Sequence, residues 1–181
     1  AEKATETESG VDVRFDGTAL KSCRRRLAAA HLLAGKWIEQ ARSAPPEVIV
    51  EHYKRATMLS PSLDEPFYIL GRFYDSLIQA GTSANSRELK SWSSNPKLDF
   101  VPLVIANFAD ALRHGHGLVY EVLPRMLTVW FDFFSHVQKT PSSDGMSVAP
   151  EVEKSVRRLS QRALQTLPKY MWMTVLPQLM S

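Results

Sequence analysis

Apolar residues recur at steps of three and four along most of this 181-residue chain, which is the spacing of one face of an α-helix. After a lead-in, residues 1–17, that lacks this periodicity, we predict seven helices that begin near residues 18, 46, 64, 99, 117, 150 and 168. The polar stretches 82–98 and 139–149 are predicted to be loops. No run alternates apolar and polar residues between turn signals, so the pattern predicts an all-α fold.

The first helix carries a long apolar stripe that we expect to face the core. Its members are Leu20, Cys23, Leu27, Ala30, Ala34, Trp37, Ile38 and Ala41. Cys23, the only cysteine, is then an inert core residue; the competing interpretation is a reactive thiol whose pKa is lowered by the adjacent Arg24, Arg25 and Arg26. A single cysteine makes no internal disulfide, which favours an intracellular protein.

The most apolar stretch is VLPRMLTVWFDFF, residues 122–134. It forms one broad apolar face, and Val129 and Phe131 are apolar on the opposite side. A helix that is apolar nearly all round is buried on both sides, so we expect 117–137 to lie between the helices before and after it. Pro124 either bends this helix or separates two short helices.

A degenerate repeat runs through the second and third helices. The end of one tetratricopeptide-like unit is matched by Tyr53, Ala56 and Pro61, and the start of the next by Phe67, Leu70, Gly71 and Tyr74. Small residues in such a frame let two helices approach closely. Ile49 stands where the repeat prefers a small residue, and the 82–98 loop breaks the period. We therefore predict a degenerate tetratricopeptide- or HEAT-like α-solenoid.

Composition is that of a globular domain, with 44% apolar and 23% charged residues. The net charge of +3 is too small to favour a nucleic-acid-binding face. The acidic opening AEKATETESG is unlike a secretory signal, and no stretch approaches the ~20 apolar residues of a membrane span. The sequence does not start with Met and stops inside an apolar helical pattern, so we expect a piece of a longer protein.

Residues that carry chemistry are few, and each has a structural interpretation. The HGHG turn places His114 and His116 two apart without a third ligand at metal-binding spacing, so we expect a helix end there and no metal. Lys21 with the three arginines beside it forms a basic band, read as a solvated face in preference to an anion site. No phosphate-binding glycine loop and no catalytic constellation is present.

Other side chains are candidates for contacts with neighbours. Arg125 and Asp132 lie seven apart, so on about the same face, where they are expected to bond to neighbouring loops. Tyr68 and Phe73 either line a peptide groove or, as we favour, pack against the next helical layer. Candidate docking and phosphorylation positions are Trp92, Thr140 and Ser160.

Three ordered blocks resemble the FAT region of the phosphatidylinositol-3-kinase-related protein kinases, most closely the ATR-type DNA-damage checkpoint kinases. They are HYKRATMLSPSLDEPFYILGRFYDSL, FADALRHGHGLVYEVLPRMLTVWFDF and YMWMTVLPQLMS. The central block is similar to the family's L-P-R-x-L-T-x-W-x-D run, here Leu123, Pro124, Arg125, Leu127, Thr128, Trp130 and Asp132. Phe134, where the family often has Gly, and the 82–98 insertion depart from the pattern.

The resemblance implies a FAT-type segment over 18–181 that is a regulatory scaffold without catalytic residues. Its partners would be the kinase domain and the neighbouring helical repeats of the same chain, with homodimer contacts or a regulatory subunit in the parent protein. The parent would be a nuclear Ser/Thr kinase, and ATP and Mg²⁺ would bind only in its kinase domain. No membrane or direct nucleic-acid contact is implied.

Two alternatives remain open. One is a stand-alone tetratricopeptide-type adaptor that binds a peptide, although such adaptors line their groove with Lys, Arg and Asn, and the candidate inner helices here are apolar. The other is the FAT segment of a TOR-type kinase, because these kinases carry a similar T-L-W-F-D run.

Overall fold

The computed structural model describes residues 17–81, 95–139 and 150–175, and these residues contain helices and no strand. The helices, in chain order, are α1 (Gly17–Ala41), α2 (Pro46–Leu59), α3 (Asp64–Gly81), α5 (Pro96–His114), α6 (Val119–Lys139), α7 (Pro150–Thr166) and α8 (Lys169–Met173). The all-α prediction is confirmed. Residues 1–16, with Trp92 and Thr140, lie outside the described residues.

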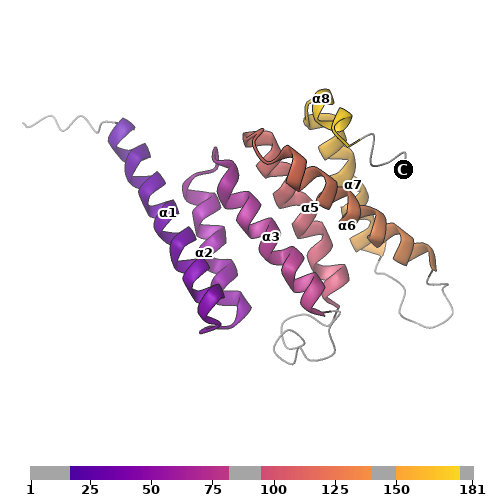
Figure 1. Ribbon diagram of the computed structural model, residues 1–181, viewed down its shortest axis with the longest axis horizontal. Helices are drawn as coiled ribbons and strands as arrows, with labels where there is room; N and C mark the ends of the chain where they lie inside the picture. Colours follow the sequence, from indigo (N-terminus) through magenta and orange to yellow (C-terminus); the bar gives the residue numbers. More distant parts are fainter. Residues whose placement is uncertain (1–16, 82–94, 140–149, 176–181) are drawn as a thin grey trace, which may run out of the picture.

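The helices follow one another in a row, with α1 at one end and α7 and α8 at the other (Figure 1). The packed pairs are α1 with α2, α2 with α3, α3 with α5, and α5 with both α6 and α7. Such nearest-neighbour packing is the arrangement of a helical-repeat solenoid, as the sequence predicted. One continuous set of buried side chains runs through the row.

Prolines and glycines set several of the helix ends. Pro46 and Pro96 occupy the first turns of α2 and α5, where a missing N–H costs no helical hydrogen bond. Gly115 ends α5 and donates its N–H to the carbonyl of Ala111 at 3.0 Å. The predicted 82–98 loop is therefore too long by its last residues, because α5 begins at Pro96.

Pro124 lies inside α6, which is one helix, so the alternative of two short helices is wrong. Its ring nitrogen has no hydrogen to donate to the carbonyl of Tyr120, four residues earlier. The proline falls in the second turn, where few helical hydrogen bonds precede it. Thr128 donates its hydroxyl to the Pro124 carbonyl at 3.0 Å, one turn further on.

The expected burial of α1 is wrong. The residues of α1 that are buried are Ala28, Leu32 and Gly35, whereas Leu27 is 50% and Trp37 62% exposed. Cys23 is also exposed, so it is not a core cysteine. Small residues on the Ala28–Gly35 face let α1 approach α2 closely, and the longer stripe is turned away from α2 as a result. Of that stripe, Ile38 packs partly against the core.

The helix α6 is buried on its α5 side, as predicted, and only partly on the other side. Leu123 is 0% and Val129 5% exposed, whereas Phe131 is 46% and Tyr120 79% exposed. Burial on both sides is therefore confirmed for Val129 and wrong for Phe131. The outer side of α6 faces solvent among the residues that the structure describes.

Two glycines allow neighbouring helices to touch. A Cβ on Gly71 would lie 2.6 Å from Cδ1 of Phe108, and Gly35 lies equally tightly against the ring of Tyr53. Because both rings are buried, neither can swing away into solvent. These contacts explain why the repeat frame has glycine at position 71, between α3 and α5.

Replacing Gly71 by alanine is expected to lower the free energy of unfolding by about 1–3 kcal/mol, because the new methyl group pushes α3 and α5 apart. Urea denaturation followed by circular dichroism measures this. The matched control is Gly117→Ala, since nothing lies within 4 Å of its Cβ position. Equal stability of the two variants would contradict the close approach at Gly71.

Candidate functional site

An ion pair between Asp75 and Arg125 joins α3 to α6, and we call this pair the Arg125 clasp. Arg125 donates Nε and Nη2 to the two carboxylate oxygens of Asp75, at 2.8 and 2.7 Å. Asp75 is 6% exposed, and Gln79 one turn later donates its side-chain amide at 3.2 Å. Hydrogen bonding to Asp75 raises the pKa of Arg125. A bidentate Arg–carboxylate pair fixes direction as well as distance, so it sets the angle between these helices.

A second polar link lies close by on the same two helices. Tyr68 of α3 donates its hydroxyl to the Glu121 carboxylate of α6. Burial, and then this hydrogen bond, raises the pKa of Tyr68.

Phe73 is 5% exposed and meets the ring of Tyr53 edge-on at 5.8 Å. Packing of Phe73 against its helical neighbours, the interpretation favoured from the sequence, is confirmed.

The resemblance residues divide into core and surface. The buried ones are Tyr53, Ala56, Leu70, Gly71, Tyr74, Leu123 and Leu127, and the half-buried ones are Phe67, Pro124, Arg125 and Trp130. Thr128 and Asp132 are exposed. Arg125 bonds to a neighbouring helix and not to a loop, so that expectation is wrong in detail. The missed partner, Asp75, has a signal in the sequence: it is an acidic residue between the core residues Tyr74 and Leu77.

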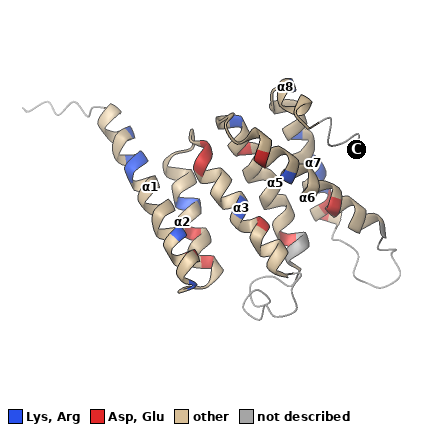
Figure 2. Cartoon of the chain, in the orientation of Figure 1, with Lys and Arg blue, Asp and Glu red and all other residues tan. Residues whose placement is uncertain are grey.

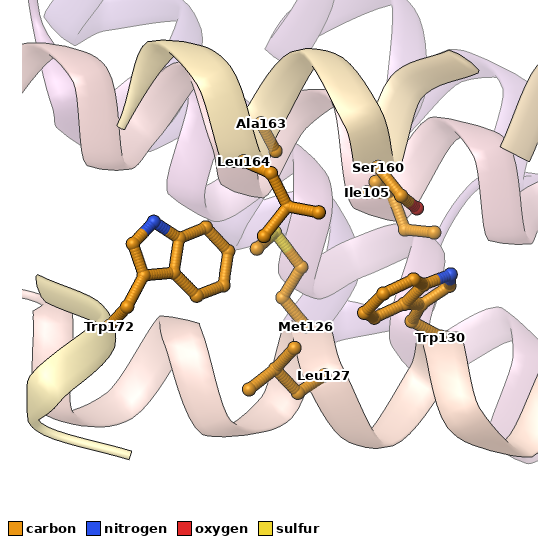
Figure 3. Close-up of a pocket in the computed structure, with 8 residues that line it drawn as sticks. All are labelled: Ile105, Met126, Leu127, Trp130, Ser160, Ala163, Leu164 and Trp172. Carbon is orange, nitrogen blue, oxygen red and sulfur yellow. The ribbon is translucent and has the colours of Figure 1, made fainter. Parts of the chain in front are cut away.

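Trp130 of α6 lines both a small cavity and a wider groove beside α7. Figure 3 shows its indole and that of Trp172, from α8, on either side of Leu164 and Met126. The space they enclose is about 10 Å³, no more than one water molecule needs. A wider groove of about 510 Å³ shares Trp130, Ser160 and Leu164 with it. The family-like tryptophan is thus at once a core and a groove residue.

The two histidines of the HGHG turn serve packing. His114 stacks on Phe67 with ring centroids 5.6 Å apart, and His116 Nδ1 lies 2.9 Å from the hydroxyl of Tyr170. Across residues 17–81, 95–139 and 150–175, no three His, Cys, Asp or Glu side chains gather closely enough to hold a metal ion. The carboxylate of Asp75, which is the most buried acid, is already bound by Arg125.

The basic band on α1 lies at the surface. Figure 2 shows Lys and Arg on its N-terminal half without acidic residues among them. Arg24, Arg25 and Arg26 are all exposed, which agrees with a solvated face. Ser160 is 7% exposed, so it is a poor phosphorylation site.

A histidine pair joins α1 to α2. The Nδ1 atoms of His31 and His52 are 3.1 Å apart. Burial, followed by the charges of His52 and Arg55, lowers the pKa of His31, and Glu51 opposes this shift. One histidine donates to the other only while at least one ring is neutral.

Acidification is therefore expected to loosen the α1–α2 contact. Because the folded-state pKa of His31 is below the ordinary histidine pKa of 6.5, the unfolded chain takes up its proton first as the pH falls. Stability is complete above that value and declines as the pH falls from it toward the folded-state pKa. Thermal unfolding at pH about 7.5 and about 5.5 should show a larger loss in the parent chain than in His31→Gln. An identical loss in both would contradict a role for His31.

Comparison with known proteins gives one family. The sequence profile of the FAT domain matches residues 1–128. The chain is 30% identical over 176 residues to the serine/threonine-protein kinase ATR of Oryza sativa subsp. indica, with 83% of this chain covered. It is 28% identical over 172 residues to ATR of Arabidopsis thaliana and 26% identical over 157 residues to the serine/threonine-protein kinase MEC1 of Candida glabrata, each over 87% of this chain.

The chain spans about 6% of the length of these relatives. No solved structure matches it. In the described part of the chain, each helix is too short or too polar to cross a bilayer. The matched region contains α1, α2, α3 and α5 and the start of α6 with its Arg125 clasp. By its sequence, this chain belongs to the FAT domain family, and its relatives include the ATR and MEC1 kinases.

Proposed function

We propose that this chain is a supporting segment of an ATR-type Ser/Thr kinase of the DNA-damage checkpoint. In this proposal the segment holds the kinase domain in position, and the kinase acts in the nucleus. Family membership and the named kinases among its relatives support this. The row of helices is suited to such a role, since the helices brace one another through buried contacts. ATP and Mg²⁺ belong, in this proposal, to the kinase domain of the parent protein.

The observation that carries the proposal is the outer face of α1. Seven residues follow alternating steps of three and four, and all are exposed or half-exposed: Leu20, Cys23, Leu27, Ala30, Ala34, Trp37 and Ala41. We call this set the α1 seam. Its spacing is that of a seam between two helices. Within the described residues, the other side of α1 packs on α2 and nothing covers the seam.

A neighbouring helical repeat of the same chain is the occupant we propose for the α1 seam. The relatives are many times longer than this chain, and a parent protein of similar length would have room for further repeats to stack on α1. Stacking would continue the row and transmit position from one repeat to the next. A homodimer contact or a regulatory subunit is the competing occupant. If that occupant is correct, a substitution on the α1 seam would change the oligomeric state or the subunit composition of the parent protein while the segment stays folded.

The test uses the complete protein with Leu27→Glu and Trp37→Glu on the α1 seam. Each charge would keep a packed helix away, so we expect faster hydrogen exchange in α1 and a loss of kinase activity of about tenfold or more, because a displaced frame misplaces reacting groups. The control is Met58→Glu, which changes an apolar residue that is 69% exposed on α2. Unchanged exchange and activity in both seam variants would refute the proposal.

A further inference from the structure

A groove runs between α6 and α7 because both helices pack on α5 more closely than on each other. Its apolar lining is Trp130, Phe131 and Phe134 from α6 and Leu164 from α7. A volume of about 510 Å³ lies within the range of ligand-binding sites. The lining residues extend for about two turns along each helix, so the groove is about 12 Å long. Phe131 and Leu164 are 46% and 50% exposed, so the groove presents apolar surface to solvent.

Two polar groups at the base of this groove have no partner. The hydroxyl of Ser160 and the indole Nε1 of Trp130 are buried and make no hydrogen bond. Figure 3 shows both atoms on the same side of the pocket. Ser160 is 7% exposed and lines the groove. Buried polar groups are nearly always hydrogen-bonded, so this pair is suited to an acceptor oxygen supplied from outside.

The lining of the groove includes one positively charged side chain. Arg157 is the one charged side chain among its lining residues, and its guanidinium lies over the ring of Phe134, 4.8 Å from the centroid. Its partner Glu153 binds it one turn earlier on the same helix, at 2.7 Å. Arg157 is 66% exposed, so that pair is weak and an incoming carboxylate can compete for the guanidinium.

We propose that the groove binds an amphipathic helix from a partner protein, with large apolar side chains along one face and acidic residues beside them. The apolar face would lie over Phe131, Phe134 and Leu164, in the manner of a helix in a groove. A carboxylate of the partner meets Arg157. An oxygen of the partner helix accepts hydrogen bonds from the Ser160 hydroxyl and the Trp130 indole, and an apolar side chain of that helix packs beside them. This inference does not depend on the proposed kinase role, because binding is measured without catalysis.

The test measures fluorescence anisotropy of a labelled probe peptide with the complete protein. The probe is a designed helical peptide of about 15 residues, with leucines at i, i+4 and i+7 and glutamates on both flanks. We expect saturable binding that Phe131→Ala and Arg157→Gln each weaken about fivefold or more. Replacing the glutamates of the probe by lysines should weaken binding by about tenfold. Both variants change exposed side chains, so folding is retained.

The matched control is Leu103→Ala, since Leu103 and Leu164 are 37% and 50% exposed and Leu103 lies on α5, outside both the groove lining and the α1 seam. Leu164→Ala should weaken binding of the probe as Phe131→Ala does, and Leu103→Ala should leave binding unchanged. Three results would overturn the proposal: no binding to the complete protein, as when another part of it covers the groove; equal binding of the lysine probe; or equal loss of binding in Leu103→Ala and Leu164→Ala. Ser160→Ala should weaken binding less than Phe131→Ala does.

Discussion

Replacement of Arg125 by alanine is expected to lower the free energy of unfolding by about 3 kcal/mol. The substitution leaves the carboxylate of Asp75, 6% exposed, with the amide of Gln79 in place of the bidentate pair. A buried charge that loses its partner retains its desolvation penalty without the compensating attraction. Since the Arg125 side chain is 37% exposed, water entering the gap limits the loss. Urea denaturation of the 181-residue chain measures it.

Two further variants make this result specific. Arg55→Ala removes a guanidinium whose pair with Glu51 is 56% and 55% exposed, so it should cost no more than about 1 kcal/mol. The double replacement Asp75→Leu with Arg125→Met removes both charges, and most of the lost stability should return. If Arg125→Ala proves no more harmful than Arg55→Ala, the clasp between α3 and α6 contributes nothing to stability.

Replacement of Tyr53 by alanine is expected to cost about 4 kcal/mol, the largest single effect in this chain. The side chain is 0% exposed and joins three helices. Its ring lies against Gly35 of α1 and meets Phe73 of α3 edge-on, and its hydroxyl donates to Glu39 at 2.6 Å. Burial, and then this hydrogen bond, raises the pKa of Tyr53 well above its ordinary value. A cavity at this point would detach α1 from the row.

Tyr53→Phe separates the ring from the hydroxyl. It keeps the packing and removes the hydrogen bond to Glu39, so the loss should be about 1 kcal/mol. Hydrogen exchange should show that Tyr53→Ala releases α1 and α2 first, while α5 keeps its protection. A loss in Tyr53→Phe as large as that in Tyr53→Ala would mean that the hydrogen bond, and not the ring, holds α1 in place.

Sequence periodicity predicts α5 well because this helix has one apolar stripe. Val104, Ile105 and Phe108 of α5 follow helical spacing and are 0%, 1% and 2% exposed. Local spacing suffices there, since a helix with a single apolar face has only one way to bury it. The close contact at Gly71 was also predictable, because the repeat pattern has small residues where two helices approach each other.

The first helix shows where periodicity fails. It has two apolar faces, and the more regular of them, with Leu27 and Trp37, is the exposed one. The choice between them depends on the shape of α2, where the ring of Tyr53 fits only against Gly35. Helical spacing holds no information about that partner.

The candidate site was predictable in part. Trp130 and Arg125 stood out from the sequence, but Asp75 is 50 residues away from Arg125, and its pairing is a property of the packed row. The groove between α6 and α7 is likewise set by how both helices lie on α5. Such features arise from three-dimensional neighbours and have no local pattern.

The central proposal is that this segment acts as a frame for the kinase domain of a longer protein. Phosphotransfer by the complete protein, compared between Arg125→Ala and the Asp75→Leu, Arg125→Met double variant, tests it most directly. The account predicts that Arg125→Ala loses activity in step with its loss of stability and that the double variant, with both charges gone but the packing kept, recovers most of it. A double variant that is as stable as the parent protein and still inactive would contradict the account, since Arg125 would then be needed for its charge and not for the frame.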